Sequence, residues 1–240
     1  MKFDYSKEDM ILKVYPSAGA CFEEAFSLLK KHFWMLVLIV FVGGVIDSPM
    51  WFVKHIQQNS DSFSFTSSVL QLTRTIYYFA VASVFSYGVA YVFTKVARKK
   101  DFVFEETFSG FKTYSRAILS NLLVVLIVVL GFVLFIIPGV FLICRLVFVP
   151  YLIMDKKHGV VESLKLSFQM TKGYFWTIFG MGILSFVMIL LGLVLFGFGI
   201  LLSLVLINAA FAVLYSACED LHYKEACEIV GLVAEDREEL

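Results

Sequence analysis

Eight residues of this chain have side chains suited to metal binding or nucleophilic attack, and they are scattered along the sequence. They are four histidines and four cysteines, His32, His55, His158, His222, Cys21, Cys144, Cys218 and Cys227. No histidine belongs to an HExxH-type ligand pattern, and no two cysteines have the CxxC spacing of a zinc or redox site. The sequence also has no GxSxG, P-loop or helix-opening GxGxxG motif. We therefore expect a non-enzymatic protein with no catalytic residue, no metal site and no cofactor.

Two pairs of adjacent acids, Glu23-Glu24 and Glu105-Glu106, could hold a metal ion or transfer protons. Each pair stands at the beginning of a segment whose apolar residues recur at helical spacing. Carboxylates in the first turn of a helix are stabilised by the positive end of the helix dipole. We therefore interpret both pairs as solvated, helix-capping groups.

Arg145 is the one charged residue that the sequence places deep within an apolar stretch. It lies about 9 Å along a helix from Gly139, and an arginine near a bilayer centre costs roughly 2.5–3.5 kcal/mol on insertion scales. The candidate partners are Asn121, Asn208, Ser203 and carbonyl groups freed by Pro150. Arg145 could bind a lipid phosphate or an anionic solute, with Asn121 and Asn208 as further contacts. It could also reach the membrane surface or lock helices together, and we favour this structural role.

The elements that must position these residues are apolar helices. Of the 240 residues, 60% are hydrophobic and 17% are charged, with a mean hydropathy of +0.84, whereas soluble domains are about 45–50% apolar and about 25% charged. The stretches 69–96, 117–137 and 174–217 hold few charges, and roughly 20 apolar residues in a helix cross a membrane. The sequence therefore predicts an all-α, polytopic membrane protein. Its net charge of zero gives no basis for nucleic-acid binding.

Six transmembrane helices are expected, arranged as three hairpins. The first four cover Phe33–Ile46, Thr75–Thr94, Ala117–Ile137 and Val140–Met154. The stretch 174–217 would be about 66 Å long as one helix, which is twice the membrane thickness. It must therefore fold back on itself and form the fifth and sixth spans.

Glycine and proline residues mark the expected reversals and kinks. Pro138-Gly139 is a turn signal between the third and fourth spans, and Gly197-Phe198-Gly199 is the corresponding signal between the fifth and sixth. Pro150 is expected to interrupt the fourth span, because proline removes a helical hydrogen bond.

Three further segments have an expected role in packing or at the membrane surface. Ala82, Ser86 and Ala90 recur every four residues and predict a seam where a neighbouring helix packs closely. The polar stretch 48–68 is interpreted as a loop, and the acidic segment 219–240 as a cytoplasmic tail that forms a short helix or a disordered end.

Lysine and arginine placement predicts the orientation, because cytoplasmic loops carry the excess of these residues. Positive charges gather before the first span, between the second and third, and between the fourth and fifth: Lys2, Lys7, Lys13, Lys30, Lys31; Lys95, Arg98, Lys99, Lys100, Lys112, Arg116; Lys156, Lys157, Lys165, Lys172. The opposite side offers only Lys54 and Arg74. Both termini are therefore expected in the cytoplasm.

Three stretches share one layout and indicate an internal repeat. Cys21-Phe-Glu-Glu-Ala-Phe-Ser27 precedes the first span, Val103-Phe-Glu-Glu-Thr-Phe-Ser109 the third and, more loosely, Val160-Val-Glu-Ser-Leu164 the fifth. Each continues through lysines to aromatic residues, as in Phe33-Trp34 and Phe175-Trp176. We interpret each stretch as an amphipathic helix on the inner leaflet. The single membrane domain, 1–240, would then hold repeat units at about 17–97, 101–157 and 159–219.

The segment Ile137–Trp176 resembles a family pattern. It runs from Ile137-Pro-Gly-Val through Arg145, Pro150 and Asp155 to Val160-Val-Glu-Ser and Thr171-Lys-Gly-Tyr-Phe-Trp176. This order is similar to that of the glycerophosphoryl diester phosphodiesterase membrane-domain family and of YciC-like bacterial inner-membrane proteins. The positions on the pattern are Pro138, Gly139, Arg145, Pro150, Glu162, Ser167, Lys172, Gly173 and Trp176, while Asp155 stands where glutamate is commoner.

The resemblance implies a bacterial cytoplasmic membrane. In some relatives this membrane module precedes a phosphodiesterase domain, but here the chain ends about twenty residues after the sixth span, so we do not expect that activity. The favoured function is a scaffold or accessory in envelope or lipid homeostasis, with membrane lipids as partners. The alternative is a transporter or lipid-translocating protein with an anionic-group site near Arg145. A homo-oligomer or a membrane-protein partner stays open.

Overall fold

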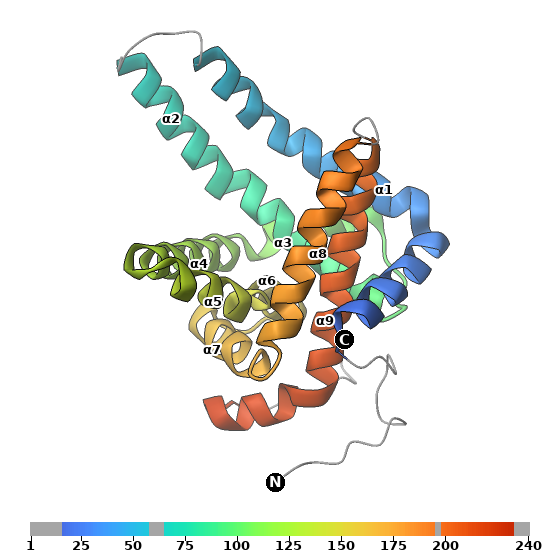
Figure 1. Cartoon of the computed structure of the whole chain (residues 1–240). Helices are drawn as coiled ribbons and strands as arrows, with labels where there is room; N and C mark the ends of the chain where they lie inside the picture. Colours follow the sequence, from blue (N-terminus) through green and yellow to red (C-terminus); the bar gives the residue numbers. More distant parts are fainter. Residues whose placement is uncertain (1–15, 58–64, 195–197, 233–240) are drawn as a thin grey trace.

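The computed structural model describes residues 16–57, 65–194 and 198–232, and all regular structure within these ranges is helical (Figure 1). The elements are α1 (Ala18–Gln57), α2 (Phe65–Tyr77), the π-helical turn η1 (Tyr78–Ala82), α3 (Ser83–Ala97), the 3₁₀ helix η2 (Phe104–Thr113), α4 (Tyr114–Leu134), α5 (Ile136–Leu146), α6 (Val149–Asp155), α7 (Val160–Met170), α8 (Phe175–Val194) and α9 (Phe198–Val230). The far half of α1 and α2 form an antiparallel pair that extends away from the other helices.

Six stretches within these helices are long and apolar enough to cross a membrane. They are Ala18–Ile46, Gln71–Ala97, Phe104–Leu134, Ile136–Asp155, Phe175–Val194 and Gly199–Val230. Because backbone polar groups find no water in the bilayer core, a helix is the structure that satisfies them there. The prediction of an all-α, polytopic membrane protein with six spans is confirmed.

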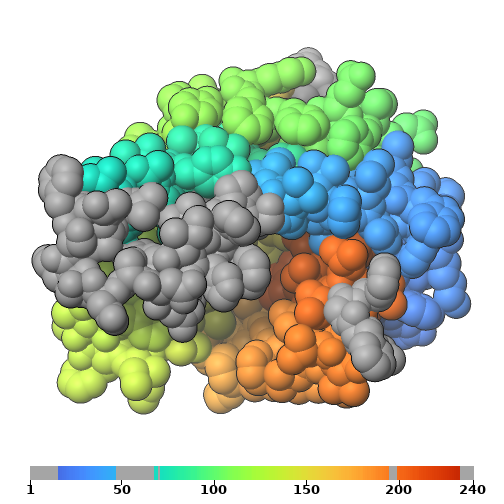
Figure 2. Space-filling model, turned by 90° about the horizontal axis from the view of Figure 1, so that it is seen from above, coloured from blue at the N-terminus to red at the C-terminus, as the bar shows by residue number. Residues whose placement is uncertain are grey.

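The second span of each successive pair is the more deeply buried. In the first, third and fifth spans the buried share of the apolar stretch is 22%, 17% and 22%, whereas in the second, fourth and sixth it is 50%, 44% and 61%. Helices α3 and α6 lie near the centre of Figure 1, while α9 runs from the top of the view to its lower edge. Seen from above in Figure 2, α1 (blue) lies at the side of α8 and α9 (orange). Helices that are apolar on all sides can occupy the periphery only where lipid surrounds them.

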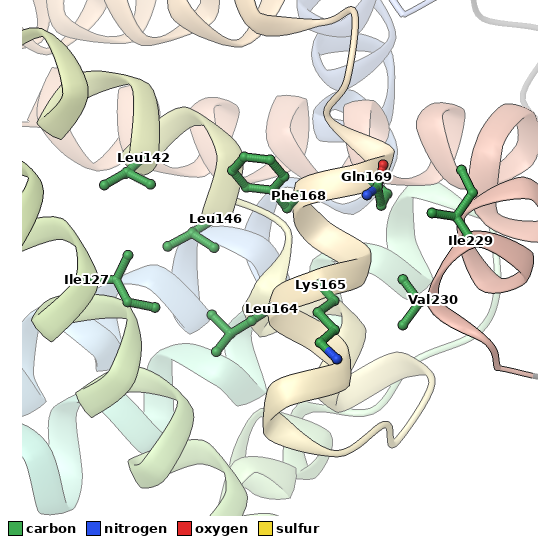
Figure 3. A pocket seen from close by; sticks show the side chains of 9 residues that line it. All are labelled: Ile127, Leu142, Leu146, Leu164, Lys165, Phe168, Gln169, Ile229 and Val230. Carbon is green, nitrogen blue, oxygen red and sulfur yellow. The ribbon is translucent and has the colours of Figure 1, made fainter.

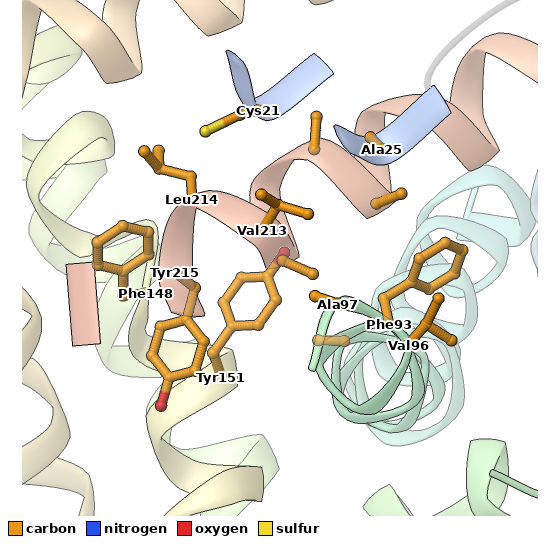
Figure 4. Packing of buried hydrophobic residues seen from close by; sticks show 14 of the residues in the cluster. Cys21, Ala25, Phe93, Val96, Ala97, Phe148, Tyr151, Val213, Leu214 and Tyr215 are labelled. Carbon is orange, nitrogen blue, oxygen red and sulfur yellow. The ribbon is translucent and has the colours of Figure 1, made fainter. Parts of the chain in front are cut away.

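Aromatic rings and small residues fill the core between the central helices (Figure 4). The rings of Tyr151 on α6 and Tyr215 on α9 stack with their centroids 5.1 Å apart, and Phe148 meets Tyr215 edge to face at 5.6 Å. Cys21 and Ala25 of α1 are completely buried and lie over α9. This side of the first predicted amphipathic segment therefore packs on protein, and Phe26, which is 50% exposed, marks the side that does not.

Each of the three segments that the sequence predicts to be amphipathic meets its span at a break in the helix. His32 within α1 has φ −124° and ψ 29°, and Thr113, between η2 and α4, has nearly the same values, φ −112° and ψ 33°. Between α7 and α8 the break includes Gly173 at φ +92°, a conformation that favours glycine. Trp34 and Trp176 follow two of these breaks and are 82% and 77% exposed.

The loop expected at 48–68 is shorter than the sequence suggested. Helix α1 continues to Gln57 and α2 begins at Phe65, so most of this stretch is helical. Trp51-Phe52-Val53 and Ile56 continue the apolar pattern beyond Pro49, and a helix keeps their peptide groups hydrogen-bonded. The polar composition was therefore a poor guide to the helix end.

The reversal between the third and fourth spans lies before Pro138-Gly139 and not at it. Helix α4 ends at Leu134, Phe135 is extended at φ −166° and ψ 159°, and α5 begins at Ile136. Proline is well tolerated in the first turn of a helix, where its missing N–H would have no partner. Gly139 is needed for packing, because a Cβ there would lie 2.6 Å from the Phe132 ring.

The interruption expected at Pro150 and the reversal expected at Gly197-Phe198-Gly199 have different outcomes. Helix α5 ends at Leu146 and α6 begins at Val149, so the fourth span is interrupted just before Pro150. Gly197 lies outside the described residues. Gly199 stands in the first turn of α9, and a Cβ on Gly192 of α8 would meet its backbone at 2.7 Å.

The seam expected on the second span at Ala82, Ser86 and Ala90 is found only in part, since Ala82 and Ala90 are buried. Ser86 is exposed, and the closest approach is at Gly88, where a Cβ would lie 1.8 Å from the Thr107 carbonyl oxygen. Reciprocally, a Cβ on Gly110 would lie 2.1 Å from the Val84 carbonyl oxygen. Helices α3 and η2 therefore pack backbone against backbone, which only glycine allows.

Candidate functional site

A buried charge cluster joins the second, fourth and sixth spans near the ends of α3 and α6. Arg98, directly after α3, donates from Nη1 to Oδ1 of Asp155 at 2.6 Å and from Nη2 to Oδ2 at 2.7 Å. Its Nη2 also contacts Oε2 of Glu219 in α9. The Arg98, Asp155 and Glu219 side chains are only 11%, 6% and 0% exposed. One guanidinium therefore holds together the second span of each pair.

Lys156 and Tyr215 complete the charge cluster, which comprises Arg98, Asp155, Lys156, Tyr215 and Glu219. The Lys156 Nζ lies 3.1 Å from Oε1 of Glu219, and the Tyr215 hydroxyl donates to Oδ2 of Asp155 at 3.0 Å. Two cations thus balance two carboxylates. A buried charge is costly unless it is paired, and here each charged group has an opposite partner.

The protonation state of Arg98 follows from these neighbours. Burial lowers the pKa of its guanidinium, but the hydrogen bonds to Asp155 and the charge of Glu219 raise the pKa by more. The net result is a pKa above the ordinary value, so Arg98 stays charged. The arrangement suits a permanent structural contact rather than proton transfer by Arg98.

The charge cluster was not predicted from the sequence. Arg98 and Lys156 were counted as flanking charges that set the orientation, and Glu219 was placed in a cytoplasmic tail. In the structure α9 continues to Val230, so the described part of segment 219–240 takes the helical form that was one of the two expected. Tyr223, Ala226 and Cys227 are buried, so much of this part also packs on the protein, which was not expected. Positions in the sequence could have indicated the cluster, because Arg98, Asp155 and Glu219 each directly follow the apolar part of the second span of a pair.

Two tyrosine–histidine hydrogen bonds hold this last part of α9. His158 Nε2 lies 2.8 Å from the Tyr223 hydroxyl, and His222 Nε2 lies 3.0 Å from the hydroxyl of Tyr174. His158 precedes α7 and Tyr174 precedes α8. The histidines therefore tie α9 to the segments on either side of α7, and within the described residues no group of three metal-ligating side chains forms.

Arg145 packs beside two aromatic rings that contact each other edge to face, with centroids 6.3 Å apart. Its guanidinium carbon lies 4.9 Å from the ring centroid of Phe141 and 4.9 Å from that of Phe168. Nη1 donates to the Phe168 carbonyl oxygen at 3.2 Å. These contacts are cation–π interactions and a hydrogen bond within the protein. They connect α5 to α7, as expected if Arg145 locks helices together.

The break in the fourth span is bridged by Ser167 of α7. Its hydroxyl donates to the Arg145 carbonyl oxygen at 2.8 Å and accepts from the Phe148 N–H at 3.2 Å. Thr171 also donates to the Arg145 carbonyl oxygen, at 3.3 Å. Two backbone groups that the break deprives of helical partners are thus satisfied by α7.

The other residues considered as partners of Arg145 lie elsewhere. Asn208 donates to the Leu204 carbonyl oxygen of its own helix at 2.8 Å, and Ser203 donates to Met188 and Gly199 carbonyl oxygens, both at 2.9 Å. Asn121 Nδ2 is buried and has no hydrogen-bond partner within the described ranges. None of the three is hydrogen-bonded to Arg145 in this part of the chain.

One acid of each predicted pair makes a structural contact. Glu24 lies 3.0 Å from Lys99, and Glu106 lies 2.5 Å from Lys95. Glu106 also accepts from the Val103 N–H at 3.3 Å, as Glu162 does from the Gly159 N–H at 2.9 Å. These carboxylates cap or anchor the amphipathic segments, and Glu23 and Glu105 are exposed.

Two grooves lie on either side of α5. One, of about 340 Å³, runs between α5 and α8 and is lined only by apolar side chains and glycine. The other, of about 550 Å³, lies among α4, α5, α7 and the end of α9 and includes Lys165 and Gln169.

Neither a family model, nor a curated protein, nor a solved structure matches the chain. Its function must therefore be argued from this geometry.

Proposed function

We propose that this chain is a non-enzymatic, multi-pass protein of a bacterial inner membrane, with both termini cytoplasmic. It would act as a scaffold or accessory in envelope or lipid homeostasis by holding lipid at the inner leaflet. The bacterial location rests on the family resemblance of Ile137–Trp176. The orientation rests on the distribution of lysine and arginine.

The supporting observation is the surface of the three amphipathic segments. Each leaves an apolar side chain and a nearby lysine exposed, and these pairs are Phe26 and Lys30, Phe108 and Lys112, and Val161 and Lys165. Exposed apolar residues can enter the acyl region, while lysines reach the phosphates. Arg98 and Arg145, in contrast, make contacts between helices of the protein.

Retained lipid is the measurement that tests this proposal. The full chain, purified in mild detergent, should carry phospholipid in native mass spectra. The double variant Lys30→Gln, Lys112→Gln should retain a smaller share of anionic phospholipid, while Arg74→Gln, which removes a cation from the other end of the second span, should not. A folded protein that is free of lipid under all mild conditions would refute the proposal.

The alternative, a transporter or lipid-translocating protein with an anionic-group site near Arg145, draws on one observation. Nε of Arg145 is buried without a hydrogen-bond partner in the described part of the chain. Against it, the guanidinium already contacts the rings of Phe141 and Phe168 and donates to the Phe168 carbonyl oxygen. Anion or lipid movement in proteoliposomes that is lost in Arg145→Gln would replace the scaffold proposal.

A further inference from the structure

The larger groove has apolar walls contributed by elements far apart in the sequence (Figure 3). Ile127 of α4 and Leu142 and Leu146 of α5 line one side, while Ile229 and Val230 at the end of α9 line the other. Figure 3 shows these side chains directed toward the space between the helices. A hydrocarbon chain matches such walls, because burial of apolar surface on both partners is favourable.

Helix α7 lies between these walls and supplies the polar groups. Leu164 and Phe168 add apolar surface, whereas Lys165 and Gln169 bring an ammonium and an amide to the same groove. Lys165 takes part in none of the ion pairs among the described residues. Its positive charge is therefore available to an anionic group on a ligand.

We propose that this groove binds one inner-leaflet phospholipid, with an acyl chain against the apolar side chains that line it and the anionic headgroup phosphate at Lys165 and Gln169. The inference rests on the proposed function and makes it specific to one site. The volume of about 550 Å³ lies in the range of roughly 300–1,000 Å³ that is usual for ligand sites. A free phosphate would contact only the two polar side chains and leave seven apolar ones unused, which favours a lipid.

Arg145 has a positioning role in this site. Phe168 lines the groove, and its ring is also one of the two that contact the guanidinium. The Phe168 carbonyl oxygen accepts from Arg145 as well. Arg145 therefore fixes the Phe168 wall of the groove, while Lys165 meets the headgroup.

Native mass spectrometry of the full chain in mild detergent tests the site, with phosphatidylglycerol and phosphatidylcholine added in separate titrations. The wild-type protein should bind one phosphatidylglycerol more tightly than phosphatidylcholine, and Lys165→Gln should weaken that binding about tenfold. Lys172→Gln is the matched control, because Lys172 is also an exposed lysine between the fourth and fifth spans but does not line the groove. A second control, Gly182→Leu, obstructs the smaller groove and should leave the binding unchanged.

Three outcomes would overturn the inference. Equal phosphatidylglycerol binding by wild type and Lys165→Gln would remove this site but leave lipid retention elsewhere, and so the proposed function, intact. Displacement of the lipid by millimolar inorganic phosphate would show that free phosphate is the ligand. Absence of lipid from the wild type and from all variants, each with an unchanged Tm, would refute the site and the proposed function together.

Discussion

Arg98 and Asp155 are 57 positions apart, yet the two guanidinium nitrogens Nη1 and Nη2 meet the two carboxylate oxygens at 2.6 and 2.7 Å. This two-point contact joins the end of the second span to the end of the fourth. Glu219 brings the sixth span to the same guanidinium. The planar fork of arginine suits such a contact, and a lysine could not reproduce it.

Arg98→Met should destabilise the protein by about 3–5 kcal/mol, because it leaves Asp155 and Glu219 buried with a single cation, Lys156, between them. Arg98→Lys should recover only part of the loss. The measurement is the Tm of the purified protein in mild detergent. Lys100→Met is the control, since Lys100 is exposed and takes part in none of the ion pairs of the described residues. Equal Tm values for Arg98→Met and Lys100→Met would contradict a structural role for the charge cluster.

Gly88→Ala should lower stability by about 1–3 kcal/mol or more, because the new Cβ would lie 1.8 Å from the Thr107 carbonyl oxygen and force η2 away from α3. Gly180→Ala, on α8, is the matched change, since nothing lies within 4 Å of a Cβ there. It should be neutral or slightly stabilising, as alanine favours helix. Thermal unfolding of the two variants distinguishes the positions, and a stable Gly88→Ala protein would show that the two backbones are farther apart.

Ser167→Ala should cost about 1–3 kcal/mol, because the Phe148 N–H is left without its acceptor inside the protein. Ser185→Ala is a suitable comparison. Ser185 is also buried, but its hydroxyl donates only to the Met181 carbonyl oxygen of its own helix at 2.7 Å. Hydrogen exchange of the α6 amides should rise in Ser167→Ala and not in Ser185→Ala, and unchanged exchange in both would refute the bridge.

The orientation predicts the result of reporter fusions. Reporters after residues 102, 158 and 235 should be cytoplasmic, and a reporter after residue 60 should be on the opposite side, because positive charges are retained on the cytoplasmic face. An external reporter at residue 102 would rule out the topology, since the connection between the second and third spans holds the most lysine and arginine.

The positions at which helices end were the least predictable part of the fold. Pro138-Gly139 marks the region of a reversal, yet the chain turns at Phe135, because proline can occupy the first turn of the following helix. The polar stretch after Ile46 contains enough apolar residues to extend α1 to Gln57. In both cases local composition identified the region and neighbouring residues set the boundary.

For the candidate site, the sequence singled out Arg145 but could not name its partners. Asn121 and Asn208 were reasonable choices by polarity, whereas the actual contacts are the rings of Phe141 and Phe168 and a carbonyl oxygen. Aromatic residues are abundant in this chain, so nothing in the sequence distinguished these two. The contacts within the charge cluster could not be identified from the sequence either, because several lysines near Arg98 have similar neighbouring residues.

The sequence alone determined that the chain is helical and has six spans, because the length of an apolar stretch and the need to hydrogen-bond every peptide group in lipid are local properties. Only the tertiary structure decided which spans are central, which charges meet, and where a groove forms beside Lys165. These features depend on distances between residues remote in the chain, such as Arg98 and Glu219. Side-chain packing sets those distances, and no periodicity encodes them.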